Sequence, residues 1–231
     1  MDPHRCSVLS ALPPHDRDLL LQKAVSRSFG PGNVVLLAGD DCDRVLLLVG
    51  GLMKLVRREY GGKETILGLA LPGDLVGEVA FIDGGAQPAD AITITPARML
   101  SIDPDLFAKV LFRSPPATVE LARCVSRRLR WTCETAVERA SVGITERMAG
   151  RLLDLSVLLD RAYGPGWDLE LPLAQRELGE LAGVSRESAC KALKAFKDQG
   201  AIDYTRKKLR ILRPDVLRRI RCAGRVSGPY L

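Results

Sequence analysis

The sequence predicts an α+β protein with an N-terminal β-roll, a long helix and a C-terminal winged helix-turn-helix. Three observations predict this order. Short apolar runs alternate with turn residues from about residue 28 to 102, which is typical of an all-β roll or barrel. A segment over about 117–140 carries apolar residues in alternating steps of three and four, the spacing of one helix face. Two shorter helical patterns then flank the tight turn "GVS".

The candidate strands are apolar runs that lie between clusters of Gly, Asp and Pro. In chain order they read "NVVLLAG", "RVLLLVGG", "LMKLVRRE", "TILGLALPG", "AITITPA" and "RMLSI". The separators include "GDD", "YGGK", "PGD" and "DGGAQP", which favour turns because Gly and Pro adopt the backbone angles that tight turns need. A helical segment begins near Pro104, and "DLFAKVLFRSPP" leads into the longer helix.

The long helix presents a heptad-like seam of mostly small residues, which would let an identical helix approach closely. Its opposite face carries Leu121, Cys124 and Trp131, and these can pack on the β-roll. Because one helix can serve both faces, we expect self-association through the seam. A helix packed only on its own β-domain is the alternative. The seam consists of Ala122, Val125, Leu129, Thr132 and Ala136.

The stretch "SVG" at residues 141–143 interrupts the helical pattern and marks a boundary. An amphipathic helix follows it. After the two helices around "GVS", the segment "AIDYTRKKLRILRP" has the pattern of a strand, a basic turn and a strand. We therefore expect three parts: a β-roll domain over residues 1–115, a dimerisation helix and hinge over 116–142, and a winged helix-turn-helix domain over 143–231.

The two short helices have the turn chemistry of a helix-turn-helix. The first helix, at about residues 174–182, ends before Gly183, which suits a left-handed cap. Ser185 is a good N-cap for the second helix, at about 186–198. An ordinary αα-hairpin that binds nothing is the alternative. The inward face of the second helix is Ala189, Leu193 and Phe196.

The exposed start of the second helix carries side chains that can read base pairs in the major groove. Arg186 can bond to O6 and N7 of guanine, and Glu187 can accept a hydrogen bond from the N4 amine of cytosine. Lys191, one turn further on, can reach another base or a phosphate. The helix N-terminus suits a backbone phosphate. The candidate DNA-binding residues are Gln175, Ser185, Arg186, Glu187, Ser188, Lys191 and, in the basic wing, Arg206, Lys207 and Lys208.

The distribution of charge supports a polyanionic partner for the C-terminal part. The net charge is +6, yet residues 1–141 hold seventeen basic and seventeen acidic residues. Residues 142–231 hold seventeen basic and eleven acidic residues and therefore contain the whole excess. Because a local basic excess attracts nucleic acid, double-stranded DNA is the expected partner. A solvated basic tail is the alternative.

Several classes of protein are not expected. The first residues, "MDPHRCSVLSALPPHDRD", lack the apolar core of a signal peptide, and no apolar run approaches the ~20 residues that span a membrane. Six scattered cysteines without a CxxC pair suggest a reducing cytoplasm. With two histidines and no nucleophile triad, P-loop or paired-acid motif, we expect no enzyme activity, cofactor or metal site.

These segments together resemble the CRP/FNR family of transcription regulators. The stretch "LAQRELGELAGVSRESACKAL" resembles the family's winged helix. Its β-roll is matched by "GGLMKLV", "LALPGDLVGE" and "FAKVL", and its dimer helix by "CVSRRLRWTCE". The resemblance covers about residues 28–213 in the right order. It implies a cyclic-nucleotide-binding-like jelly roll as effector domain, a homodimer on a near-palindromic operator, and a surface that contacts RNA polymerase.

The resemblance also implies a pocket for a small-molecule effector. In members that bind cyclic AMP, a Gly-Glu pair meets the ribose, a nearby arginine meets the cyclic phosphate, and the dimer helix closes over the base. Cys133, in the dimer helix, replaces a usual serine, and it is either a thiol sensor or a small hydrophobe. The matching residues here are Gly77, Glu78, Gln87, Pro88, Ala89, Thr132 and Cys133.

The arginine of that pocket is missing, because Gln87 or Pro88 stands in its place. No Lys or Arg occurs between Lys63 and Arg98, and a buried phosphate needs a paired cation or many N–H donors. We therefore expect an effector other than a conventionally bound cyclic nucleotide, or a regulator that needs no effector. Two alternatives stay open: a cyclic-AMP-responsive regulator with a rearranged phosphate site, and a ligand-sensing adaptor whose hairpin contacts protein.

Overall fold

The computed structural model describes residues 6–58, 64–163, 173–205 and 208–223 of the 231-residue chain. The chain divides into two compact units, Met1–Trp131 and Thr132–Leu231. The long helix α5 (Pro115–Ser141) contributes to both units, because their boundary falls between its residues 131 and 132. The three-part division expected from the sequence stays a prediction.

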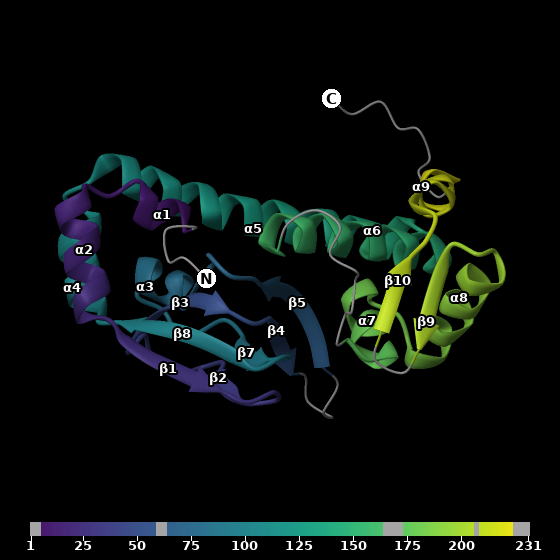
Figure 1. Cartoon of the computed structure of the whole chain (residues 1–231), viewed down its shortest axis with the longest axis horizontal. Helices are drawn as coiled ribbons and strands as arrows, with labels where there is room; N and C mark the ends of the chain where they lie inside the picture. Colours follow the sequence, from purple (N-terminus) through teal and green to yellow (C-terminus); the bar gives the residue numbers. More distant parts are fainter. Residues whose placement is uncertain (1–5, 59–63, 164–172, 206–207, 224–231) are drawn as a thin grey trace. The chain divides into compact units, whose positions relative to one another are not determined.

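The first unit contains a β-roll of two four-stranded antiparallel sheets (Figure 1). Consecutive strands mostly lie in different sheets, as in the jelly-roll architecture. One sheet has the order β1 (Val25–Phe29), β8 (Ala97–Ile102), β3 (Val45–Gly50) and β6 (Leu75–Val76). The other has the order β2 (Val34–Leu36), β7 (Asp90–Thr93), β4 (Met53–Arg58) and β5 (Glu64–Ala70).

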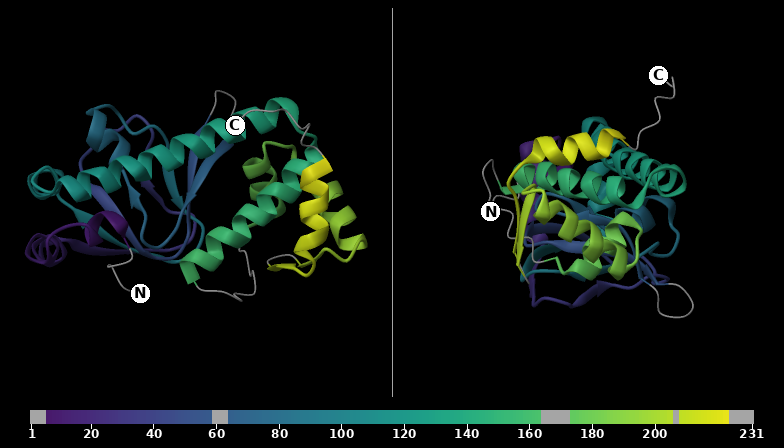
Figure 2. Two further views of the ribbon diagram at one scale, coloured as in Figure 1. Left: turned by 90° about the horizontal axis from the view of Figure 1, so that it is seen from above. Right: turned by 90° about the vertical axis from the view of Figure 1, so that its right-hand side faces the viewer.

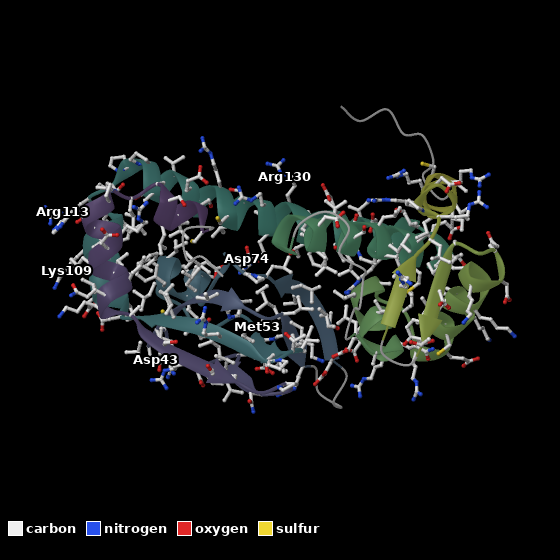
Figure 3. All side chains as sticks on the ribbon, in the orientation of Figure 1. Asp43, Met53, Asp74, Lys109, Arg113 and Arg130 are labelled. Carbon is white, nitrogen blue, oxygen red and sulfur yellow. The ribbon has the colours of Figure 1, made fainter. Side chains whose placement is uncertain are left out.

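Strand β3 is buried on both faces. Its residues alternate between two apolar clusters: Leu46 and Leu48 join the cluster between the sheets, and Leu47 joins the cluster under the helices. Successive side chains of a strand point to opposite faces, so a strand between two layers needs a continuous apolar run. Met53, at the start of β4, is fully buried inside the roll (Figure 3).

Helices cover the outer face of the first sheet. Helix α4 begins at Pro104 because the Oδ1 of Asp103 accepts a hydrogen bond from the backbone N–H of Leu106 at 2.9 Å. Lys109 and Arg113 point away from the roll at this end (Figure 3). The helices of this unit, besides the first part of α5, are α1 (Ser7–Ser10), α2 (Pro14–Lys23), α3 (Glu78–Asp83) and α4 (Pro104–Leu111). Leu9, Leu20, Phe107 and Leu121 are buried where α1, α2, α4 and α5 meet the sheet.

The turn between β3 and β4 requires a glycine. Gly51 has a φ of +93°, and a β-carbon there would lie 2.5 Å from the carbonyl oxygen of Pro96. Any other residue would therefore be strained and would clash with backbone.

The second unit contains the end of α5, helix α6 (Ile144–Tyr163) and a winged helix-turn-helix. The hairpin is α7 (Gln175–Ala182) and α8 (Arg186–Asp198), and the wing is the antiparallel pair β9 (Ile202–Thr205) and β10 (Lys208–Ile211). Helix α9 (Pro214–Ala223) lies against α6 (Figure 2). The core of this unit includes Met148, Leu152, Leu155, Leu159, Leu178, Leu181, Leu193 and Phe196.

The predicted strands are present, and the helix expected at 186–198 matches α8. The sequence pattern does not indicate β1, β6, α1, α2 or α3. Strand β1 pairs only with β8, and four of its five residues are exposed, so it lacks an apolar pattern. Strand β6 has two residues, too few for any periodicity.

Candidate DNA-binding surface and effector site

The turn of the helix-turn-helix is held by local contacts. Gly183 ends α7 in the left-handed conformation, with a φ of 65° and a ψ of 38°. Ser185 then caps α8, because its Oγ accepts a hydrogen bond from the backbone N–H of Ser188 at 3.1 Å. Both features confirm the predictions made from the sequence. The left-handed Gly183 and the Ser185 cap therefore fix where α8 begins.

Helix α8 has one buried and one exposed face. Arg186, Glu187 and Lys191 are exposed. The Nζ of Lys191 lies 2.8 Å from Glu187 Oε1, and these two side chains are 77% and 78% exposed. An exposed pair of this kind contributes less than about 1 kcal/mol, so either side chain is free to contact a base or a phosphate instead. The buried face is Ala189, Leu193 and Phe196.

Gln175 links the two helices of the hairpin. The Sγ of Cys190, on α8, donates a hydrogen bond to Gln175 Oε1 at 2.9 Å. This contact was not predicted from the sequence, because no local pattern relates Cys190 to Gln175. Of the predicted wing residues, Lys208 begins β10, and Arg206 and Lys207 lie outside the described residues.

Arg147 of α6 joins the turn of the hairpin to the end of α5. Its Nη1 donates hydrogen bonds to the carbonyl oxygens of Arg139 and Val142, at 2.9 and 3.3 Å. Its Nη2 donates to the carbonyl oxygen of Gly183 at 3.5 Å. The guanidinium group therefore contacts the end of one helix and the turn that precedes α8.

Arg151, one turn further along α6, makes a second connection to α5. It is 6% exposed, and its Nη2 donates to Thr135 Oγ1 at 2.9 Å and to Glu138 Oε2 at 2.6 Å. Its Nη1 donates to Asp154 Oδ2 at 2.9 Å. Arg221 of α9 contacts the other oxygen of Asp154 at 3.0 Å. The last turns of α5 thus belong to the unit that carries the helix-turn-helix.

Glu78 is a buried carboxylate in the first unit. It is 3% exposed and follows Gly77, whose φ is +90°. Arg128 of α5 donates to Glu78 Oε1 and, at 3.4 Å, to the carbonyl oxygen of Leu75. Burial raises the pKa of Glu78, and the charge of Arg128 opposes that shift. The other oxygen, Oε2, is buried and has no hydrogen-bond partner.

Gln87 lies in the loop between α3 and β7 and points inward. Its backbone N–H donates to the carbonyl oxygen of Asp40 at 2.7 Å. The side chain is 4% exposed, and its Nε2 is buried without a hydrogen-bond partner. A β-carbon on Gly77 would lie 3.5 Å from this nitrogen. The amide of Gln87 is therefore next to the Gly77-Glu78 corner.

Positive charge reaches this loop from another strand. Arg57, on β4, donates from Nη1 to the carbonyl oxygen of the exposed Pro88 at 3.1 Å, beside the half-buried Ala89. Arg58 forms an ion pair with the buried Asp90 at 3.0 Å. The lack of Lys and Arg between residues 63 and 98 therefore does not leave the loop without cations. Sequence reasoning missed them because β4 and β7 become neighbours only in the folded sheet.

Helix α5 has a covered face and an exposed one. Leu121 is 3% exposed in the core of the roll, and Cys124 packs against that cluster. Leu129 is 63% exposed, and Arg130 points away from the sheets (Figure 3). Of the predicted seam, Ala122, Leu129, Thr132 and Ala136 are exposed and Val125 is half-buried. Thr132 and Cys133, predicted for the effector pocket, are both exposed and belong to the second unit.

Neither a metal centre nor a membrane segment is found in the described part of the chain. No group of three or more His, Cys, Asp or Glu side chains there could hold a metal ion. No helix among the described residues is both long and apolar enough to cross a membrane. His15 lies on α2, and His4 is outside the described residues.

Comparison with known proteins matches both units. Residues 26–114 match the cyclic nucleotide-binding domain, and residues 146–220 match the Crp-like helix-turn-helix domain. The chain is 29% identical over 198 residues to the CRP-like cAMP-activated global transcriptional regulator of Mycobacterium tuberculosis, covering 86% of this chain and 88% of that protein. It is 29% identical over 191 residues to the cyclic AMP receptor protein of Thermus thermophilus, covering 83% and 85%.

Solved structures show the same fold. The structure of FixK2 from Bradyrhizobium japonicum superposes with a TM-score of 0.75 at 18% identity, covering 85% of this chain and 96% of that one. A β-roll, a long helix and a winged helix-turn-helix with an exposed second helix define a DNA-binding transcription regulator. The two matched domains, in this order, show that the chain belongs to the CRP/FNR family. That family consists of transcription regulators and not of enzymes.

Proposed function

We propose that the protein binds a near-palindromic DNA site as a homodimer and reads its sequence with α8. The exposed start of α8 carries this proposal, because Arg186 and Glu187 project from a helix whose cap and buried face are already in place. Arg186 suits the O6 and N7 of guanine, and Glu187 suits the N4 amine of cytosine. We assign the remaining contacts, to phosphates or to a further base, to Gln175, Ser185, Ser188, Lys191 and the wing residues Arg206, Lys207 and Lys208.

The exposed face of α5 supports the homodimer. Leu129 is 63% exposed in the single chain, and the seam residues Ala122, Thr132 and Ala136 are exposed as well. Apolar side chains at helical spacing are covered when two copies of a helix pack about a two-fold axis. A two-fold dimer would present two copies of α8 to half-sites about one turn of DNA apart, which accounts for a near-palindromic operator.

An effector and RNA polymerase complete the proposed function. The relatives in Mycobacterium tuberculosis and Thermus thermophilus are named for cyclic AMP. In this chain Gln87 or Pro88 stands at the position where the resemblance to the family places the phosphate-binding arginine. We infer that the protein either needs no effector or binds one that no arginine of this loop holds. We also propose that the DNA-bound dimer acts on transcription through a surface that contacts RNA polymerase.

Selection from a pool of duplexes with a randomised centre tests the proposal. The purified protein is expected to enrich a two-fold symmetric sequence, with an affinity that falls steeply as salt rises, because phosphate contacts release counterions. Arg186→Ala is expected to lose about 1–3 kcal/mol at one base position and to relax the preference there. Arg98→Ala removes the same charge from the exposed surface of β8 and is the control.

The outcomes separate the competing functions. An equal loss for Arg186→Ala on every sequence would show that this residue contacts only phosphate. Failure to enrich any symmetric sequence, together with binding that does not depend on salt, would refute DNA reading. That result would favour a ligand-sensing adaptor whose hairpin contacts protein.

A further inference from the structure

We propose that a charged network at the end of α5 sets the spacing between the two halves of the DNA site. The network joins three helices and fixes the helix-turn-helix to the helix that carries the dimer seam. This inference rests on the proposed function and adds a second kind of specificity, since α8 reads the bases and the network selects the distance between the half-sites. The charged network consists of Glu138 on α5, Arg151 and Asp154 on α6, and Arg221 on α9.

The network begins on the last turns of α5. Glu138 Oε2 accepts a hydrogen bond from Arg151 Nη2 at 2.6 Å, and Thr135 Oγ1 accepts from the same nitrogen at 2.9 Å. Thr135 and Arg151 are each 6% exposed. Because a buried, hydrogen-bonded ion pair is costly to break, this contact resists a change in the way α6 is held on the end of α5. The same turns of α5 carry the exposed seam residues Thr132 and Ala136.

Arg221 brings α9 into the network. Its Nη1 donates to Asp154 Oδ1 at 3.0 Å, and its Nη2 lies 4.0 Å from Glu138 Oε1. Asp154 also accepts from Arg151, so that the two arginines share two carboxylates. Gly150 of α6 leaves room for this arrangement, because a β-carbon there would already lie 3.5 Å from Arg221 Nε. Helix α9 is therefore tied both to α6 and to the end of α5.

The wing connects α9 to α8. The backbone N–H groups of Leu212 and Arg213, between β10 and α9, donate to the carbonyl oxygen of Ala201 at 2.9 and 3.0 Å. Ala201 lies between the end of α8 and the start of β9. Helix α6 also packs against α7 and α8 directly. The position of α8 is therefore fixed to the end of α5 by two routes, one through α6 and one through the wing, α9 and Arg221.

A fixed junction in each copy of the chain gives a fixed distance between the two copies of α8. Adding or removing one base pair moves the half-sites by about 3.4 Å along the DNA and turns one against the other by about 35°. A dimer with rigid junctions can bind such a site only if the DNA deforms, which costs free energy, whereas a dimer with loose junctions can follow the change. The charged network should therefore restrict binding to a narrow range of spacers.

Binding of the full chain to duplexes that differ only in the spacer tests the inference. The duplexes carry the half-site that the wild type selects, separated by its preferred spacer or by a spacer one base pair shorter or longer. The wild type is expected to bind the altered spacers at least ~10-fold more weakly than the preferred one. Arg221→Gln should reduce this difference to less than ~3-fold. Arg218→Gln removes the same charge from an exposed position of α9 and should keep the wild-type preference.

Two further variants separate the network from a general loss of stability. Asp154→Asn removes the charge that both arginines contact and should relax the spacer preference as Arg221→Gln does. Arg221→Lys keeps the charge but loses the forked geometry, so an intermediate preference is expected. The ratio of affinities for two spacers does not depend on the fraction of folded protein, and a merely structural role would leave it unchanged. An equal loss of affinity on every spacer would therefore overturn the inference, as would wild-type preferences in both Arg221→Gln and Asp154→Asn.

The same measurements distinguish the failure of this inference from the failure of the proposed function. Selection of a symmetric site by the wild type, with a spacer preference that no network variant changes, refutes the inference and leaves DNA reading by α8 standing. The absence of any symmetric selection by the wild type refutes the homodimeric DNA-reading function, and the inference falls with it.

Discussion

Replacing Leu129 by glutamate is expected to disrupt the proposed homodimer. Leu129 lies on α5 and is 63% exposed, on the same seam as the exposed Ala122 and Ala136. In a two-fold dimer each residue of the interface occurs twice, so that one substitution changes the interface in both copies. The variant would place two carboxylates in a contact that is apolar in the wild type.

The exposure of Leu129 sets the size of the effect. Complete burial of a leucine side chain contributes about 1.5–3 kcal/mol. Because 63% of the residue is available for burial by a partner, each copy contributes about 1–2 kcal/mol and the dimer about 2–4 kcal/mol. At about 1.4 kcal/mol per factor of ten, the Kd for dimerisation should rise by about 30- to 700-fold. Repulsion between the two carboxylates adds to this.

Sedimentation equilibrium over a range of protein concentrations measures that Kd. Val157→Glu is the matched control, because Val157 is 68% exposed, lies on α6 and is not a residue of the seam. It should leave the Kd unchanged while it introduces the same charge. A Leu129→Glu protein that dimerises as tightly as the wild type would refute the assignment of this face of α5 as the interface.

The remaining predictions concern stability. Arg151→Ala should lower the free energy of unfolding by about 3 kcal/mol, because it leaves the partly buried Glu138 without its closest partner; a calorimetric loss below about 1 kcal/mol would contradict this. Ser185→Ala removes the cap of α8 and should cost about 1 kcal/mol in urea unfolding, and no measurable cost would contradict the cap. Because burial raises the pKa of Glu78 in the folded state, its carboxyl group keeps a proton at pH values above its ordinary pKa of 4.5. The free energy of unfolding therefore falls as the pH rises from 4.5 through the pKa of the folded state. Glu78→Gln should remove that fall, and an equal fall in both proteins would count against it.

Features that depend on neighbours along the chain were predictable from the sequence. The left-handed Gly183 and the cap at Ser185 act over three or four residues, and both are confirmed. The continuous apolar run of β3 also predicted a buried strand, because a strand that lies between two layers is apolar on both faces. Strand β1 was not predicted, because it is exposed along most of its length and its sequence therefore has no apolar pattern.

The sequence by itself therefore determined the order of β-roll, long helix and winged helix-turn-helix, together with the exposed start of α8, because local periodicity, turns and caps specify them. Tertiary structure alone decided which charges meet. Arg57 contacts Pro88 across 31 positions of sequence, and Arg128 reaches Glu78 across 50. The pairing of β4 with β7 and the packing of α5 bring these groups together. The charge at a site depends on which side chains lie close together in space, and local sequence patterns do not indicate contacts between residues that are far apart in the chain.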